Sequence, residues 1–75
     1  MAISSGFEAP NDGFVKVLCN PTGAVAYVTL SIGGSAFGVS TGGYSNTASY
    51  PIAKGQTVIV TGSLNASVSL EYMHS

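Results

Sequence analysis

The clearest pattern in this chain is the strict alternation over residues 66–73, which read ASVSLEYM. The large side chains of Val68, Leu70 and Tyr72 are each separated from the next by one polar residue. Successive side chains of a β-strand point to opposite faces of a sheet, so a period of two predicts a strand with one buried face. We therefore predict a strand here and search the rest of the chain for the same period.

Working outward from this strand, the alternation recurs in earlier segments, and helical spacing is absent. The predicted strands are 14–19 with Val15, Val17 and Cys19 on one face, 24–32 with Val28, Leu30 and Ile32 inward, 36–41 with Phe37, Val39 and Thr41 together, and 57–61 with Val58 and Val60 together. Segments rich in Gly, Pro and Asn separate them and predict turns, with a tight meander as the simplest order. A weaker strand is predicted over 44–50, and Pro51 after it indicates either a sheet edge or the end of the segment. The expected fold is all-β, a small antiparallel β-sandwich or barrel of five to seven short strands.

The chain divides into two parts on this pattern. Residues 14–75 are expected to form a single β domain, because no shift in composition marks a second one. Residues 1–13 form an N-terminal arm that we predict to be irregular, since Gly6, Pro10 and Asn11 interrupt any period. Two interpretations of this arm stay open: a frayed tail, or an arm that docks onto a neighbouring molecule through Ile3 and Phe7.

The composition is poor in charge. Only 7% of the residues are charged, with two lysines, no arginine and three acidic residues, against about 25% in an ordinary soluble domain. A chain of this kind binds partners by apolar fit and neutral hydrogen bonds. It has no clustered Lys or Arg for nucleic acid and no apolar run of about 20 residues for a membrane span. The first residues show neither the basic region nor the apolar stretch of a secretory signal, so we expect synthesis in the cytoplasm.

Catalytic and metal-binding residues are scarce. The only histidine is His74, the penultimate residue, and Cys19 ends an apolar strand, where a buried thiol is expected. Glu8 and Asp12 lie in the arm, far in the sequence from Glu71, and one Cys and one His fall short of four zinc ligands. We therefore expect no catalytic residues, no metal and no cofactor, and a protein that is not an enzyme.

The size of the chain favours association with other chains. A domain of 75 residues rarely gains more than about 3 to 5 kcal/mol from its core. A lone cysteine excludes an intrachain disulfide as reinforcement. We therefore expect a homo-oligomer, in which neighbouring copies share apolar surface.

Two segments resemble those of the small all-β capsid decoration (cement) proteins of tailed bacteriophages. They are residues 53–61, AKGQTVIVT, and 66–72, ASVSLEY, which together with the short polar arm cover about half of the chain. The resemblance implies a structural protein of the virion that clips across neighbouring subunits of the major capsid protein, or binds another virion protein, and stabilises the assembled shell, often as a trimer. It carries over no functional residue.

The expected partner contacts follow from the strand faces rather than from the resemblance. Apolar side chains that point outward or lie in the arm are candidates, namely Ile3, Phe7, Phe14, Leu18, Tyr27 and Ile59.

Two other functions remain open. The chain could be a glycan-binding or cell-surface adhesion module, because tyrosine rings stack on sugars. Of its four tyrosines, Tyr27 is the best surface candidate, Tyr72 is expected in the core, and Tyr44 and Tyr50 flank a polar segment. The chain could also be a fibre or appendage subunit, since neutral strand edges pair readily with other edges.

Overall fold

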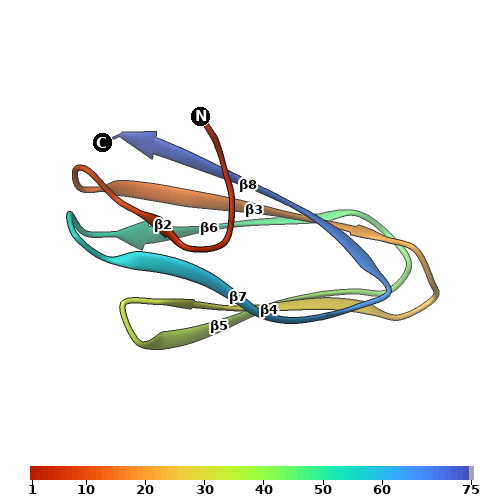
Figure 1. Ribbon diagram of the computed structural model, residues 1–75. Helices are drawn as coiled ribbons and strands as arrows, with labels where there is room; N and C mark the ends of the chain where they lie inside the picture. The colour runs from red at the N-terminus through yellow and green to blue at the C-terminus, as the bar shows by residue number, and fades with distance from the viewer. Residues whose placement is uncertain (75) are drawn as a thin grey trace.

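Two antiparallel sheets of four strands each pack face to face in the computed structural model, which describes residues 1–74 (Figure 1). The strands are β1 (Ala2–Ile3), β2 (Phe7–Glu8), β3 (Gly13–Pro21), β4 (Ala26–Ile32), β5 (Ser35–Thr41), β6 (Asn46–Ile52), β7 (Thr57–Leu64) and β8 (Ala66–His74). The predicted all-β sandwich is confirmed. The described part of the chain contains eight strands rather than five to seven, because the N-terminal arm contributes two short ones.

The order of the strands in the two sheets is β1-β8-β3-β6 and β2-β7-β4-β5. Only β4 and β5 form a hairpin within one sheet, and every other connection crosses to the opposite sheet. The expected meander is therefore wrong beyond that hairpin. The meander prediction failed because a period of two shows which face of a strand is buried but carries no information about which strand lies beside it.

The core lies between the two sheets and is supplied mainly by the central strands. The fully or nearly fully buried side chains include Val15, Val17 and Cys19 of β3, Val28, Leu30 and Ile32 of β4, and Val39, Val58, Leu70 and Tyr72 of their neighbours. All of these residues lie on the faces that the alternation predicted. The buried side chains of β3 and β4 belong to one core, to which each of the two sheets contributes one central strand.

The corner between β7 and β8 consists of a single residue, Asn65, which adopts a positive φ of 49°. Asparagine tolerates this left-handed conformation better than most residues. Its carbonyl oxygen accepts a hydrogen bond from the backbone N–H of Thr22 at 2.6 Å, and its Nδ2 donates to the carbonyl oxygen of Val25 at 3.0 Å. The turn between the predicted strands 57–61 and 66–73 is thus shortened to one residue, because β7 continues to Leu64 before the chain changes sheets.

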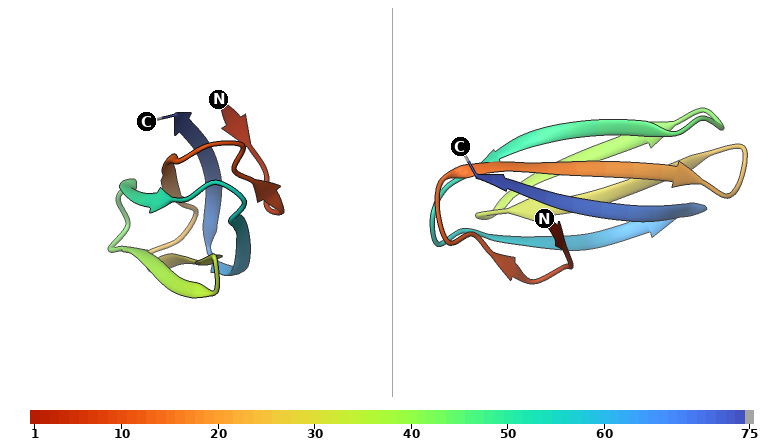
Figure 2. Two further views of the ribbon diagram at one scale, coloured as in Figure 1. Left: turned by 90° about the vertical axis from the view of Figure 1, so that its left-hand side faces the viewer. Right: turned by 90° about the horizontal axis from the view of Figure 1, so that it is seen from above.

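The N-terminal arm is not irregular as expected, because it joins both sheets (Figure 2). β1 pairs with β8 and β2 pairs with β7, so the arm crosses one open side of the sandwich. Met1 and Tyr72 exchange two hydrogen bonds, at 3.1 and 2.8 Å, and the ring of Phe7 lies 5.2 Å from that of Tyr72. Strands of two residues are too short to show any alternation, which explains why the sequence did not predict them.

We expect the hydroxyl of Tyr72 to stabilise the junction between the arm and the core. This buried side chain donates a hydrogen bond of 2.7 Å to the carbonyl oxygen of Asn11. Tyr72→Phe should lower the free energy of unfolding by about 1 kcal/mol, because it removes this hydrogen bond. Urea denaturation measures the effect, with the exposed Tyr44 changed to Phe as the matched control. Equal midpoints for the two variants would contradict the prediction.

The opposite side of the sandwich is closed by side chains. β5 and β6 are the edge strands of the two sheets, and Tyr50 Oη donates to the carbonyl oxygen of Gly38 at 3.3 Å. Asn46 Nδ2 donates to the carbonyl oxygen of Ser40 at 2.9 Å, and the rings of Phe37 and Tyr50 lie 4.4 Å apart. The predicted edge position of the segment 44–50 is confirmed, but the strand does not end before Pro51, because β6 continues to Ile52.

Candidate docking surface

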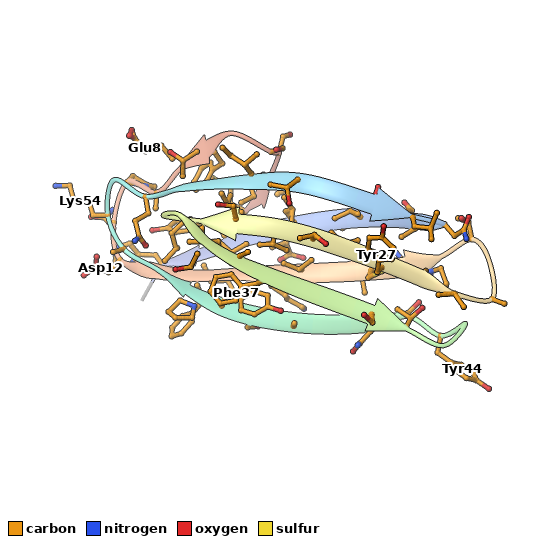
Figure 3. The ribbon with its side chains drawn as sticks, turned by 90° about the horizontal axis from the view of Figure 1, so that it is seen from below. Glu8, Asp12, Tyr27, Phe37, Tyr44 and Lys54 are labelled. Atoms are coloured by element: carbon orange, nitrogen blue, oxygen red, sulfur yellow. The ribbon has the colours of Figure 1, made fainter. Side chains whose placement is uncertain are left out.

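Charged residues are unevenly distributed over the molecule. Glu8, Asp12 and Lys54 lie at one end, and the exposed rings of Tyr27 and Tyr44 lie at the other (Figure 3). Strands β4, β5, β6 and β7 contain no charged residue. The long axis of the sandwich is 36 Å in extent. It therefore runs from an end with three charged residues to an end with exposed tyrosines.

The outer face of β7, β4 and β5 contains no charged side chain. On β4, Tyr27, Thr29 and Ser31 point outward, because the alternate residues of this strand are buried. The register places three pairs beside them: Leu64 and Ser40 beside Tyr27, Gly62 and Gly38 beside Thr29, and Ile59 and Ala36 beside Ser31. We call these nine residues the uncharged face. The two glycines at its centre have no side chains, so the face is flat there and a second flat surface can approach closely.

The uncharged face continues onto the loops at the end where Tyr27 and Tyr44 are exposed. Gly43 in the β5–β6 loop lies against the carbonyl group of Ala24 in the β3–β4 loop, so the two loops are neighbours. They present Val25 and Tyr44 to solvent, and the Tyr44 side chain is 82% exposed. Tyrosine beside Ser, Gly and Asn is the composition of many binding loops, because its ring offers a large contact area with few rotatable bonds. We call Val25, Tyr27, Tyr44 and Leu64 the neutral end.

The opposite outer face, formed by β8, β3 and β6, has a different character. Its register places Phe14 between Pro51 and Met73, and Leu18 between Thr47 and Ser69. The row between these two contains Lys16 directly opposite Glu71. A surface that docks here would have to cover both charges, which makes this face the less favourable one for a dry contact.

The six contact residues predicted from the sequence fall in three separate places. Tyr27 and Ile59 lie on the uncharged face, whereas Phe14 and Leu18 lie on the opposite face. Ile3 and Phe7 are half-buried and pack against the protein's own core. The set therefore does not form one surface. It also omitted Val25 and Leu64, although the absence of charge from Lys16 to Lys54 and from Lys54 to Glu71 was a signal for this part of the molecule.

The residues considered for catalysis and for sugar binding are also dispersed. Cys19 is buried, His74 lies at the end of β8, and no group of three or more His, Cys, Asp or Glu within residues 1–74 is close enough to hold a metal ion. Tyr72 is buried, as predicted, and Tyr50 packs against Phe37. Tyr27 and Tyr44 are the tyrosines exposed at the neutral end.

The fold and the surface define an antiparallel β-sandwich with one uncharged face. No protein-family model, no curated protein and no solved structure matched the chain. No helix within the described residues is long and apolar enough to cross a membrane. The arguments about function therefore depend on the surface itself.

Proposed function

We propose that this protein is a non-enzymatic structural protein of the virion, a capsid decoration protein that docks on an assembled shell and stabilises it. The observation that carries the proposal is the uncharged face together with the neutral end. Interface cores are depleted in charged residues and enriched in tyrosine, and this surface has both properties. The major capsid protein, or another virion protein, would be the partner.

The dimensions of the uncharged face favour a contact repeated over many copies. The three strands, of 7, 7 and 8 residues, cover roughly 350 Å², since strands lie about 4.8 Å apart and rise about 3.3 Å per residue. A stable interface buries about 800 Å² on each partner. One copy would therefore bind weakly, and a homo-oligomer, such as a trimer, would gain affinity by binding several shell subunits at once.

Stabilisation of the shell then follows from mass action. A protein that binds only the assembled form stabilises it by about 2.7 kcal/mol per site at a hundredfold excess over Kd. Because a shell has many sites, a small gain at each one is sufficient.

The direct test is cosedimentation with assembled shells of the virus that carries the gene. Tyr27→Asp should lower binding at least about tenfold, because it buries an unpaired carboxylate in the contact. Phe14→Asp is the matched control, since Phe14 is 45% exposed on the opposite face and Tyr27 is 41% exposed on the uncharged face. Light scattering on the same preparations reports the oligomeric state.

The dependence of shell binding on salt provides a second readout. Binding should change less than about twofold between about 50 mM and about 500 mM salt, because screening weakens contacts between charges and leaves neutral contacts intact. Loss of binding in Phe14→Asp alone would assign the contact to the opposite face. Failure of the unmodified protein to bind shells would refute the proposed function.

A second candidate function is supported by the two tyrosines of the neutral end. Tyr27 and Tyr44 are exposed at the same end of the sandwich, where neutral loops could hydrogen-bond to sugar hydroxyls (Figure 3). Under this alternative, the protein is a glycan-binding module, and Tyr44→Ala would abolish binding in a glycan screen. A screen without any bound glycan would exclude it.

A further inference from the structure

One side of the sandwich contains an incompletely paired strand, β8. Its inner edge pairs with β3 along its whole length, from Ala66 to His74. At the outer edge, β1 pairs only with Leu70 and Glu71, and Met1 adds its contact to Tyr72. Within the part of the chain that the structure describes, no strand lies beside the stretch Ala66–Ser69 on this outer edge.

The direction of the backbone groups in this stretch follows from the contact at Tyr72. Both the N–H and the C=O of Tyr72 bond to Met1, so they point to the outer edge. In an antiparallel strand these directions alternate from residue to residue. Val68 and Ala66 therefore direct their N–H and C=O groups to the open outer edge, whereas Ser67 and Ser69 direct theirs to β3.

A groove of about 420 Å³ lies along this open edge. Residues 2–5 of the arm form one wall, and Val60, Val68 and Leu70 contribute apolar side chains to its lining. Val60 and Val68 pack against the core, but their side chains are only half-buried. On the corresponding side between β5 and β6, the rings of Phe37 and Tyr50 lie 4.4 Å apart and cover the core.

We propose that this groove binds an extended peptide segment of a partner protein, which adds to β8 as a strand beside Ala66–Ser69. The unpaired backbone groups of Ala66 and Val68 offer strand hydrogen bonds to an added segment, and the half-buried valines favour apolar side chains at alternate positions. The groove lining contains no charged residue, so the segment is neutral.

The occupant is a single segment rather than a second sandwich. The open edge is short, bounded by β1 at one end and by the corner at Asn65 at the other, and the arm rises beside it. The open stretch Ala66–Ser69 is four residues long, whereas the edge strands β5 and β6 have 7 residues each, so a short extended segment matches it better than the edge of a second sandwich. This inference does not depend on the partner being a viral shell.

Amide hydrogen exchange, followed by NMR on the full chain, tests the proposal. In the free protein, the amides of Ala66 and Val68 should exchange at least about tenfold faster than those of Ser67 and Ser69, which bond to β3. The probes are three blocked pentapeptides with Thr at the odd positions and Val, Ile or Ala at the even ones. At least one should slow exchange at Ala66 and Val68 about tenfold or more as its concentration rises.

The control peptide carries the same side chains but has N-methyl groups on the amides that would pair with β8. It should not bind, because it cannot form the strand hydrogen bonds. Val68→Pro provides a second control, since it removes one outer-edge donor without removing a bond to β3. The peptide control keeps the test valid even if this variant fails to fold.

Three results would overturn the proposal. They are slow exchange at Ala66 and Val68 in the free protein, absence of binding by all three peptides, and equal binding of the methylated peptide. Amide exchange at Ala66 and Val68 that becomes slower as the protein concentration rises, without any peptide, would identify a second copy of the chain as the occupant. This result would also overturn the proposal. None of these measurements uses shells, so they are independent of the proposed function.

Discussion

Leu30→Ala is expected to leave a large fraction of the protein unfolded at room temperature. Leu30 lies at the centre of β4 and its side chain is 0% exposed. Removal of a fully buried leucine side chain to alanine costs about 2 to 5 kcal/mol, because apolar contacts are lost and a cavity remains. A domain of this size has only about 3 to 5 kcal/mol of stability in total. Circular dichroism during urea denaturation measures the loss.

Leu64→Ala is the matched control for this change. It removes the same atoms from a strand residue that is 46% exposed on the uncharged face. Its cost should be less than about 1 kcal/mol, because little apolar area leaves water on folding. Similar midpoints for the two variants would mean that the core does not lie between β3 and β4 as described. If an oligomer buries Leu64, the loss of stability in Leu64→Ala would be larger and would depend on the protein concentration.

Gly13→Ala is expected to lower the stability of the protein strongly, second only to Leu30→Ala among the stability variants proposed. Gly13 begins β3 between Ile52 and His74, and a Cβ atom there would overlap the carbonyl oxygen of Met73 and lie 3.1 Å from Cε1 of Tyr72. A backbone oxygen held in a sheet cannot rotate away as a side chain does. The strands must therefore separate, and crowding of this kind costs about 1 to 3 kcal/mol.

Gly62→Ala tests whether this loss reflects the site rather than the substitution. Gly62 is also a strand residue, it has no positive φ, and an added Cβ would have no atom within 4 Å. Its stability should be unchanged or raised by about 0.4 to 1 kcal/mol, because alanine reduces the freedom of the unfolded chain. If both variants were equally stable in thermal denaturation, the close approach of β3 and β8 at Gly13 would be refuted.

Much of the local structure could be predicted from the sequence. Val15, Val17 and Cys19 are buried on one face of β3, and Val68, Leu70 and Tyr72 face the core from β8, both as expected. These predictions succeeded because burial of alternate residues is a local property of a strand. β1 and β2 could not be predicted, since strands of two residues exist only through their partners β8 and β7.

The candidate site was predicted less well. Tyr27 and Ile59 lie on the uncharged face, but Phe14 and Leu18 proved to lie on the other sheet, and Phe7 contacts Tyr72. Each residue was correctly judged apolar and away from the buried face of its strand, or part of the arm. Whether two such residues share a surface depends on the order of strands in the sheets, which connections between sheets determine.

The sequence by itself determined that this chain is all-β, which side chains of each long strand are buried, and how little charge its surface can carry. Only the tertiary structure decided that β7, β4 and β5 lie side by side, so that their neutral outer residues merge into one face. It also decided that β8 keeps an open edge beside the arm. The physical reason is that alternation acts between neighbours in the chain, whereas sheet hydrogen bonds join residues far apart in it.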